Sequence, residues 1–144
     1  MKDMSELNGL RYEDLEVGMS GVFTKTISES DINLFAGLSG DTNPLHLNAD
    51  YAAASRFGAR ISHGMLTAGL LSAIFGTKVP GPGCAYVNQS LKFKAPVYIG
   101  DTVAARATLT KLVPEKNFSE WRTECAVKGE VVIEGEATIW TPSK

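Results

Sequence analysis

HGMLTAGLLSAIFG, residues 63–76, is the most informative stretch of the chain for its architecture, because it holds no Asp, Glu, Lys or Arg. A helix that is apolar on every side is typical of an element that is buried on every side. The stretch is too short to cross a bilayer, which takes about 20 apolar residues. VPGPG, residues 79–83, follows and ends it, because Pro and Gly interrupt regular structure. The sequence therefore predicts one long, buried central helix.

Beyond this helix the chain alternates between apolar and polar residues with the period of a β-strand. Four segments show the pattern: residues 91–95, 101–113, 121–127 and 131–140. The links between these segments are short, and Gly129 and Glu130 are expected to form a tight turn between the last two. The second half therefore predicts an antiparallel meander.

The first half carries one strand and two shorter helices. Residues 21–27 alternate in the same way and predict a first strand. A capping box at Ser28 predicts that a helix follows, and Gly40 is its expected C-terminal stop. Asn48 is expected to cap a short helix over residues 49–54.

A long buried helix and an antiparallel sheet together predict an α+β fold, in which the sheet curls around the helix. Such a sheet leaves an exposed edge, so we expect two copies of the chain to pair through it. Residues 1–16 are interpreted as a polar N-terminal extension, and residues 17–144 as a single domain. A chain of 144 residues buries about 68–70% of its unfolded surface and needs no disulfide or metal to fold.

Composition excludes several classes of partner. The net charge of −2 argues against nucleic acid, which calls for a basic face. Cys84 and Cys125 stand far apart with no CxxC or Cys/His cluster, so two reduced thiols are favoured over a disulfide or a metal site. Residues 1–18 hold several acids and no apolar core, unlike a leader peptide. We expect a cytoplasmic protein without membrane contacts, metal or cofactor.

SGDTNPLHLN, residues 39–48, places a carboxylate and an imidazole five positions apart, at Asp41 and His46. One interpretation is a plain turn, because Asp and Asn favour turns and Pro44 fixes one backbone angle. The other is an acid/base pair that holds a water molecule. An unbroken helix would place these side chains about 140° apart. A bend at Asn43 and Pro44 is therefore expected to turn both toward one pocket.

Ser62, His63 and Gly64 stand at the start of the central helix. The first amides of a helix lack partners and carry partial positive charge, and glycine lets a ligand approach the backbone closely. An amide here could bind a carbonyl oxygen that gains negative charge, although a plain helix start is the simpler interpretation. A nucleophilic Ser62–His63 pair is disfavoured, because adjacent side chains rarely face each other and the chain has no G-x-S-x-G elbow.

Three further polar residues have two interpretations each. Lys92 and Lys94 share one face of a predicted strand. They either form a solvated face or bind the phosphates of a nucleotide-bearing substrate. Ser72 lies inside the apolar helix, where its hydroxyl either bonds back to that helix or steadies a catalytic group.

These motifs together carry a resemblance. FAGLSGDTNPLHLNADYAAASRFGARISHGMLTAGLLSAIFG, residues 35–76, resembles the hydratase motif of the MaoC-like (R)-specific enoyl-CoA hydratases. QSLKFKAPVYIGDTV, residues 89–103, is similar to a strand pair of that family. The similarity runs from about residue 20 to the C-terminus. It implies a hot-dog fold, an antiparallel sheet wrapped around a long central helix, that works as a homodimer.

The resemblance also implies roles for individual residues. Asp41 and His46 match the catalytic pair of the family, and Gly64 matches the glycine whose amide binds the thioester carbonyl. Ser72 matches a serine that supports the site, and Asn43 is taken as a second supporting residue. In the expected mechanism Asp41 draws a proton from water, while His46 orients that water and delivers a proton to C2. The sequence does not distinguish which member of the pair gives the C2 proton.

The implied activity is the reversible syn hydration of a trans-2-enoyl-CoA to an (R)-3-hydroxyacyl-CoA, with an acyl-CoA thioester as the partner. An acyl pocket is expected over three helix residues, Leu71, Ile74 and Phe75. One alternative is a 3-hydroxyacyl-carrier-protein dehydratase, and another is a non-catalytic module that binds acyl thioesters. A basic rim would favour the carrier protein, and its candidates are Arg56, Arg60, Lys92 and Lys94. Polyester precursor supply and fatty-acid oxidation both fit this chemistry.

Overall fold

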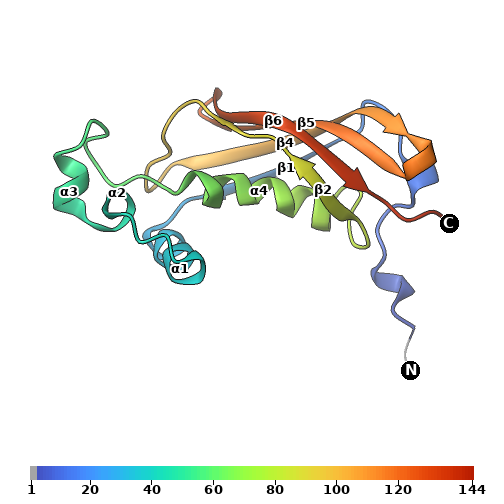
Figure 1. Cartoon of the computed structure of the whole chain (residues 1–144), viewed down its shortest axis with the longest axis horizontal. Coiled ribbons are helices and arrows are strands. Elements are labelled where there is room, and N and C mark those ends of the chain that lie inside the picture. The colour runs from blue at the N-terminus through green and yellow to red at the C-terminus, as the bar shows by residue number, and fades with distance from the viewer. Residues whose placement is uncertain (1–2) are drawn as a thin grey trace.

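The computed structural model describes residues 3–144 and contains four α-helices and six β-strands (Figure 1). The helices are α1 (Glu29–Ser39), α2 (Pro44–Leu47), α3 (Ala49–Ala53) and α4 (Gly64–Thr77). The strands are β1 (Ser20–Thr26), β2 (Ala85–Gln89), β3 (Lys92–Phe93), β4 (Thr102–Val113), β5 (Phe118–Val127) and β6 (Glu130–Trp140). No helix among the described residues is long and apolar enough to cross a lipid bilayer.

The strands form one antiparallel sheet in the order β1-β4-β5-β6-β2, and β3 pairs with β6. Helix α4 runs along one face of this sheet, while α1, α2 and α3 project beyond its end (Figure 1). This layering confirms the α+β architecture that the sequence pattern predicted. Strands β1 and β2 are the two edges of the sheet.

The core lies between α4 and the sheet. Every second residue of β4 is buried at its centre: Val103, Ala105, Ala107 and Leu109. Phe75 of α4 is 1% exposed and meets Trp121 of β5 edge to face, with ring centroids 5.3 Å apart. Cys84 and Cys125 are free thiols, as predicted. The period-two pattern of the long strands was therefore a correct guide to which side chains face the helix.

The prediction that α4 is buried all round was wrong for the single chain. One stripe of the helix is exposed, and it consists of Met65, Gly69, Ser72 and Gly76. A single sheet can cover only one side of a helix, so the opposite side faces outward. Three of these four residues are Gly or Ser, which explains why the sequence reads as apolar although this side adds little apolar surface.

The ends of α1 follow the predicted capping signals. The Ser28 hydroxyl accepts a hydrogen bond from the Asp31 amide at 3.1 Å, and the Asp31 carboxylate accepts one from the Ser28 amide at 2.9 Å. Gly40 ends the helix with a φ of 83°, a left-handed conformation that glycine adopts without strain. Asn48 caps α3 through the Tyr51 amide, also as predicted.

Two features of the sheet differ from the sequence expectation. Strand β2 was not predicted, because its pairing with β6 shifts register between Tyr86 and Asn88, which interrupts the alternation. The segment over residues 91–95 contributes only the two paired residues of β3. The turn before β6 lies at Lys128 and Gly129, with φ values of 50° and 82°, rather than at Gly129 and Glu130.

The N-terminal segment packs against the domain. Tyr12 and Leu15 are 8% and 5% exposed and belong to the hydrophobic core. The Leu10 amide donates to the carbonyl of Pro80 at 2.7 Å. The boundary between an extension and a domain at residue 16 stays a prediction, but residues 12–15 contribute apolar side chains to the shared core.

Replacing Leu15 by Ala should lower the free energy of unfolding by about 2–5 kcal/mol, because it leaves a cavity in the core. Leu7→Ala is the matched control: Leu7 is 66% exposed, and surface substitutions change stability by about 0.5 kcal/mol or less. Urea denaturation of both variants measures the difference. Equal midpoints for the two would show that residues 12–15 are not part of the folded unit.

Candidate active site

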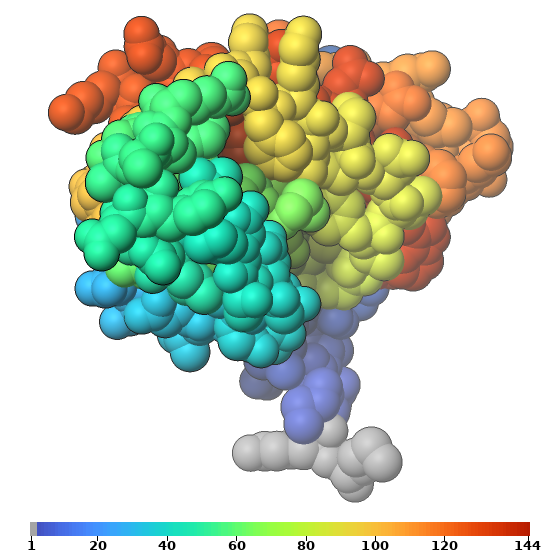
Figure 2. Space-filling view, turned by 60° about the vertical axis from the view of Figure 1, so that its left-hand side comes forward, coloured from blue at the N-terminus to red at the C-terminus, as the bar shows by residue number. Residues whose placement is uncertain are grey.

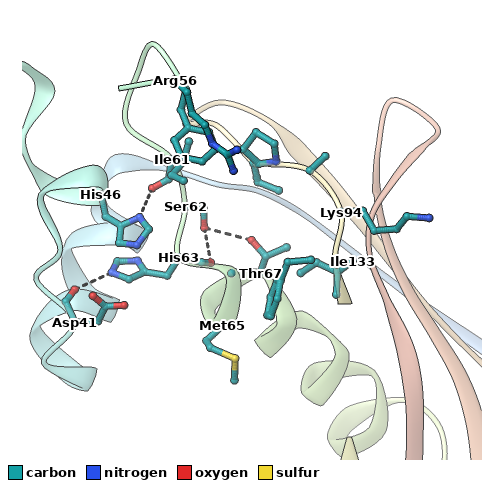
Figure 3. A pocket seen from close by; sticks show the side chains of 16 residues that line it. Asp41, His46, Arg56, Ile61, Ser62, His63, Met65, Thr67, Lys94 and Ile133 are labelled. Carbon is teal, nitrogen blue, oxygen red and sulfur yellow. Dashed lines mark hydrogen bonds between the residues drawn. The ribbon is translucent and has the colours of Figure 1, made fainter. Parts of the chain in front are cut away.

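Asp41, His46 and Gly64 line one cavity of about 400 Å³. The cavity lies between the lobe of α1–α3 and the segment that follows β2, and Figure 2 shows the hollow between these two parts of the surface. Its apolar wall comes from the loop before α4, from α4 itself, from β3 and β6, and from the loop between β3 and β4: Ile61, Met65, Phe93, Val97 and Ile133. The predicted pair and the predicted glycine therefore share one site (Figure 3).

His46 is placed by the short helix α2. Asn43 caps this helix by accepting a hydrogen bond from the Leu45 amide at 3.0 Å, and Pro44 occupies its first turn. Proline suits this position because its missing N–H would have no helical partner. The predicted bend at Asn43 and Pro44 is thus the start of a helix, and only the residues before it are non-helical. Asn43 fixes the start of α2, the helix that carries His46, and its supporting role stays a prediction.

The His46 ring has a defined tautomer. Its Nδ1 lies 2.8 Å from the carbonyl oxygen of Ile61, so Nδ1–H donates and Nε2 carries the free lone pair. His46 is 8% exposed. Burial lowers the pKa of His46, and so does the nearby His63, while the Ile61 carbonyl and Asp41 act in the opposite direction. The net shift is downward, which favours a neutral ring that accepts a proton at Nε2.

Asp41 lies on the non-helical segment after α1 and is exposed. Its carboxylate accepts a hydrogen bond from the Asn43 amide at 3.2 Å. One polar side-chain atom from each of Asp41, His46 and His63 lies within 4.8 Å of the others. A single water molecule with hydrogen bonds of about 2.8 Å spans such a gap. The pair can therefore hold one water.

The same three residues are the group among residues 3–144 that could hold a metal ion. Each histidine has one ring nitrogen engaged by a backbone carbonyl, of Ile61 for His46 and of Asp41 for His63. Only one nitrogen of each ring is left with a free lone pair, which can bind a metal ion or accept a hydrogen bond. This set suits a bridging water as well as it suits a cation.

Gly64 is the first residue of α4, and no side chain caps this helix. Its first amides have no partner within the helix and carry the positive end of the helix dipole. A Cβ at position 64 would lie 2.6 Å from the ring of Phe93, so any other residue here would require that ring to move. The N-terminus of α4 thus brings unpaired amides to the cavity wall.

The predicted supporting serine and the predicted acyl pocket lie outside the cavity. Ser72 is on the exposed stripe of α4, and the three residues assigned to an acyl pocket are buried in the core: Leu71, Ile74 and Phe75. Their roles stay predictions. Thr67 and Met65 line the cavity instead. Both follow Gly64 within one turn of α4, a spacing that could have indicated them, whereas the wall residues from the strands give no local signal.

Two polar features of the loop before α4 were interpreted from the sequence alone. The Ser62 hydroxyl donates to the His63 carbonyl at 3.1 Å and lies 3.3 Å from the Thr67 hydroxyl. The His63 ring bonds to Asp41 instead. These contacts agree with the expectation that Ser62 and His63 are not a nucleophilic pair.

The predicted basic rim is smaller than expected. Arg56 and Lys94 line the cavity, and Lys94 lies 3.5 Å from the carboxylate of Glu134. Arg60 does not line it, because its guanidinium bonds to Glu29 at 2.5 Å and to the His46 carbonyl at 2.6 Å. Lys92 does not line it either. Arg60 is therefore a structural link between α1 and α2.

Comparison with known proteins places this site in a family. A family profile described as "MaoC like domain" matches residues 16–133. A protein of Rhodospirillum rubrum named (R)-specific enoyl-CoA hydratase is 63% identical over 133 residues, which cover 92% of each chain. A 3-hydroxybutyryl-CoA dehydratase of Methylorubrum extorquens is 47% identical, covering 98% of this chain and 90% of that protein.

Solved structures agree with this result. The unliganded R-hydratase PhaJ1 of Pseudomonas aeruginosa superimposes with a TM-score of 0.89 at 42% identity, covering 94% of this chain and 88% of that one. The (R)-hydratase of Aeromonas caviae gives a TM-score of 0.87 at 39% identity, covering 90% and 99%. The predicted hot-dog fold is confirmed. With a profile match over most of its length and a relative 63% identical to it, the chain belongs to the MaoC-like domain family.

Proposed function

We propose that this protein is an (R)-specific enoyl-CoA hydratase, a hydro-lyase that adds water reversibly to a trans-2-enoyl-CoA. The observation that carries the proposal is that His46, whose Nε2 is free, and Asp41 line one cavity together with the start of α4. A ring nitrogen of His46 and a carboxylate oxygen of Asp41 lie within 4.8 Å of each other. Relatives named (R)-specific enoyl-CoA hydratase in R. rubrum and A. caviae support it. The product is an (R)-3-hydroxyacyl-CoA.

The N-terminus of α4 activates the substrate by polarising its thioester carbonyl. The thioester carbonyl accepts a hydrogen bond from the Gly64 amide, and the positive end of the helix dipole adds to this polarisation. Electron density moves from C3 toward the carbonyl oxygen, so C3 becomes the electrophile. Stabilisation of this kind is typically worth about 10²–10³-fold in rate.

Water is activated by the pair. It donates one hydrogen bond to Nε2 of His46 and the other to the carboxylate of Asp41. As the oxygen bonds to C3, His46 takes the first hydrogen as a proton, and the π electrons move onto C2 and the carbonyl oxygen. His46 then returns this proton to C2 on the same face. The second hydrogen stays on the new hydroxyl, so all atoms of the water end in the product.

The proposed mechanism changes the roles that were expected from the sequence. In the expected mechanism Asp41 takes the proton from water and His46 delivers a proton to C2, which requires a histidine that starts protonated. The lowered pKa of His46, due first to its burial, favours a neutral start. Asp41 then orients the water and stabilises the imidazolium that forms.

A 3-hydroxyacyl-carrier-protein dehydratase is the second candidate. Arg56 and Lys94 at the cavity favour it, because an acidic carrier protein would meet positive charge there. A tomato protein named as such a dehydratase is 36% identical over 132 residues. The same pair would run the reverse reaction. The complete set of Asp41, His46 and Gly64 argues against a module without catalysis.

Asp41→Asn and His46→Ala should each lower kcat by about 10²–10⁴-fold while the fold remains intact, because each removes a group that contacts the water. The assay is loss of the enoyl-thioester absorbance with crotonyl-CoA, followed by chiral analysis of the product. Asp50→Asn, an exposed acid on α3, is the matched control and should retain wild-type kcat. Either site variant with most of its kcat intact would refute the assignment, and a wild type active only on carrier-linked substrate would favour the dehydratase.

The acid limb of the kcat/KM profile should lie below pH 6.5, the ordinary pKa of histidine. His46 must be neutral to accept the proton, and its pKa is lowered by burial, so activity falls only as the pH drops through that lowered value. Initial rates from pH 4.5 to 9 at low substrate concentration measure the limb. A limb at or above 6.5 would contradict a neutral His46 in the free enzyme.

Two copies of the chain are proposed to pair through the β2 edge and the exposed stripe of α4. Tyr86 and Val87 of β2 are 41% and 48% exposed, and Met65 of α4 is 58% exposed. An exposed apolar edge strand is a ready template for pairing with another chain. A cytoplasmic location and a role in polyester precursor supply also remain proposals. The (R)-hydratase of A. caviae, which is involved in PHA biosynthesis, supports the second.

Val87→Lys should convert the dimer into a monomer, because it places a charge on the pairing edge. Thr24→Lys, on the exposed face of β1 at the opposite edge, is the matched control and should leave the dimer unchanged. Size-exclusion chromatography with light scattering gives the mass of each. A monomeric wild type, or dissociation by Thr24→Lys alone, would overturn the choice of edge.

A further inference from the structure

His63 is one of only two histidines in the chain, and the mechanism above gives it no proton to move. It is 1% exposed, directly before Gly64, and it lines the same cavity as the catalytic pair. Its side chain does not cap α4. A buried imidazole that neither caps its helix nor takes part in the reaction needs another explanation.

The ring of His63 contacts residues of two other elements. It lies 3.9 Å from the His46 ring, centroid to centroid and tilted by 31°, and 4.8 Å from the ring of Phe35 on α1. Figure 3 shows the His63 ring next to both His46 and Asp41. One side chain from the start of α4 therefore packs on the helix that carries His46.

The hydrogen bond of His63 defines its tautomer. Nε2 lies 2.9 Å from the backbone oxygen of Asp41, so Nε2–H donates to that carbonyl. Nδ1 is buried and has no hydrogen-bond partner among the described residues. A hydrogen on Nδ1 would be a buried, unpaired donor, so Nδ1 carries a bare lone pair. The two histidines are thus held in opposite tautomers, with Nδ1–H in His46 and Nε2–H in His63.

We propose that His63 is a positioning residue that holds both members of the catalytic pair in place. It fixes Asp41 through the backbone hydrogen bond and His46 through ring contact. The proposal rests on the proposed function, because the residues that it positions are those assigned to the water. His63 itself transfers no proton and acts through Asp41 and His46.

His63 also affects the pKa of His46, together with the other groups that surround that ring. The charged or titratable groups near it are Asp41 and His63 in the cavity, Arg56 and Lys94 at the rim, and Arg60 with Glu29 behind its carbonyl. Two protonated imidazole rings 3.9 Å apart would repel each other, so the pair resists double protonation and His63 lowers the pKa of His46. Removing it while keeping the ring volume should raise that pKa.

The first test is NMR of protein with ¹⁵N-labelled histidine. Two histidines give only four ring nitrogens, so two-bond ¹H–¹⁵N correlations assign each tautomer. We expect Nε2–H for His63 and Nδ1–H for His46. In His63→Phe, which keeps a buried ring, the titration of His46 should move to higher pH. Nδ1–H on His63, or an unmoved titration of His46, would overturn the proposal.

The second test is kinetic. His63→Phe should lower kcat by about 10²-fold, the typical cost of a misplaced catalytic group, with KM within about threefold of wild type. The acid limb of its pH profile should move to higher pH. His63→Gln, whose side-chain N–H can reach the Asp41 carbonyl, should recover part of kcat but keep the shifted limb. If His63→Phe fails to fold, as judged by circular dichroism, His63→Gln carries the test.

Ser119→Ala is the control for stability alone. Ser119 is fully buried on β5, accepts a hydrogen bond from the Trp121 indole at 2.8 Å and does not line the cavity. Its loss should lower the melting temperature without changing kcat or the pH profile. Wild-type kcat and an unshifted limb in His63→Phe would refute the proposal. If the wild type hydrates no enoyl thioester, the proposed function fails, while the NMR measurement still tests His63.

Discussion

Packing of α4 against one face of the sheet is the constraint on which the rest of the molecule depends. The helix contributes Leu71, Ile74 and Phe75 to the core, each 1% exposed or less. Because these side chains fix the rotation of the helix, they also fix where it begins. Gly64 and its unpaired amides arrive at the cavity for that reason. The same packing leaves the opposite stripe of α4 uncovered. The orientation of α4 on the sheet therefore determines both the position of the cavity and the surface available to a second copy.

The chemistry at the other side of the cavity depends on backbone carbonyls rather than on further side chains. The Ile61 carbonyl fixes the tautomer of His46, and the Asp41 carbonyl fixes that of His63. Arg60 joins α2 to α1 by bonding to the His46 carbonyl and to Glu29. The lobe that carries the pair thus projects beyond the sheet but is tied to it through the loop before α4. A defined tautomer costs no reorganisation when substrate binds, which is the basis of electrostatic preorganisation.

Sequence reasoning was strongest where local chemistry decides structure. The capping box at Ser28 and the glycine stop at Gly40 depend on contacts within a few residues of one another, and the alternation in β4 follows from the period of an extended strand. It was weaker where the outcome depends on distant segments. Strand β2 was missed because a register shift breaks its pattern, and the cavity wall from Phe93 and Ile133 forms only when β3 and β6 pair. The role of Arg60 was likewise invisible, since its partners lie 14 and 31 positions away.

In the proposed mechanism and the proposed dimer, the exposure of Asp41 connects catalysis to assembly. The carboxylate is open in the single chain, and Met65, which lines the same cavity, is 58% exposed. Charged groups stabilise a transition state best where water is excluded, because the local dielectric is then low. A site in which Asp41 is solvated therefore stabilises a charged transition state less than a closed site would. A second copy that covers the outer stripe of α4 would bury surface next to this opening and exclude bulk water from it. In the proposed dimer, one contact would therefore have two effects: it would cover the stripe of α4 that the sheet leaves exposed, and it would close the open side of the cavity.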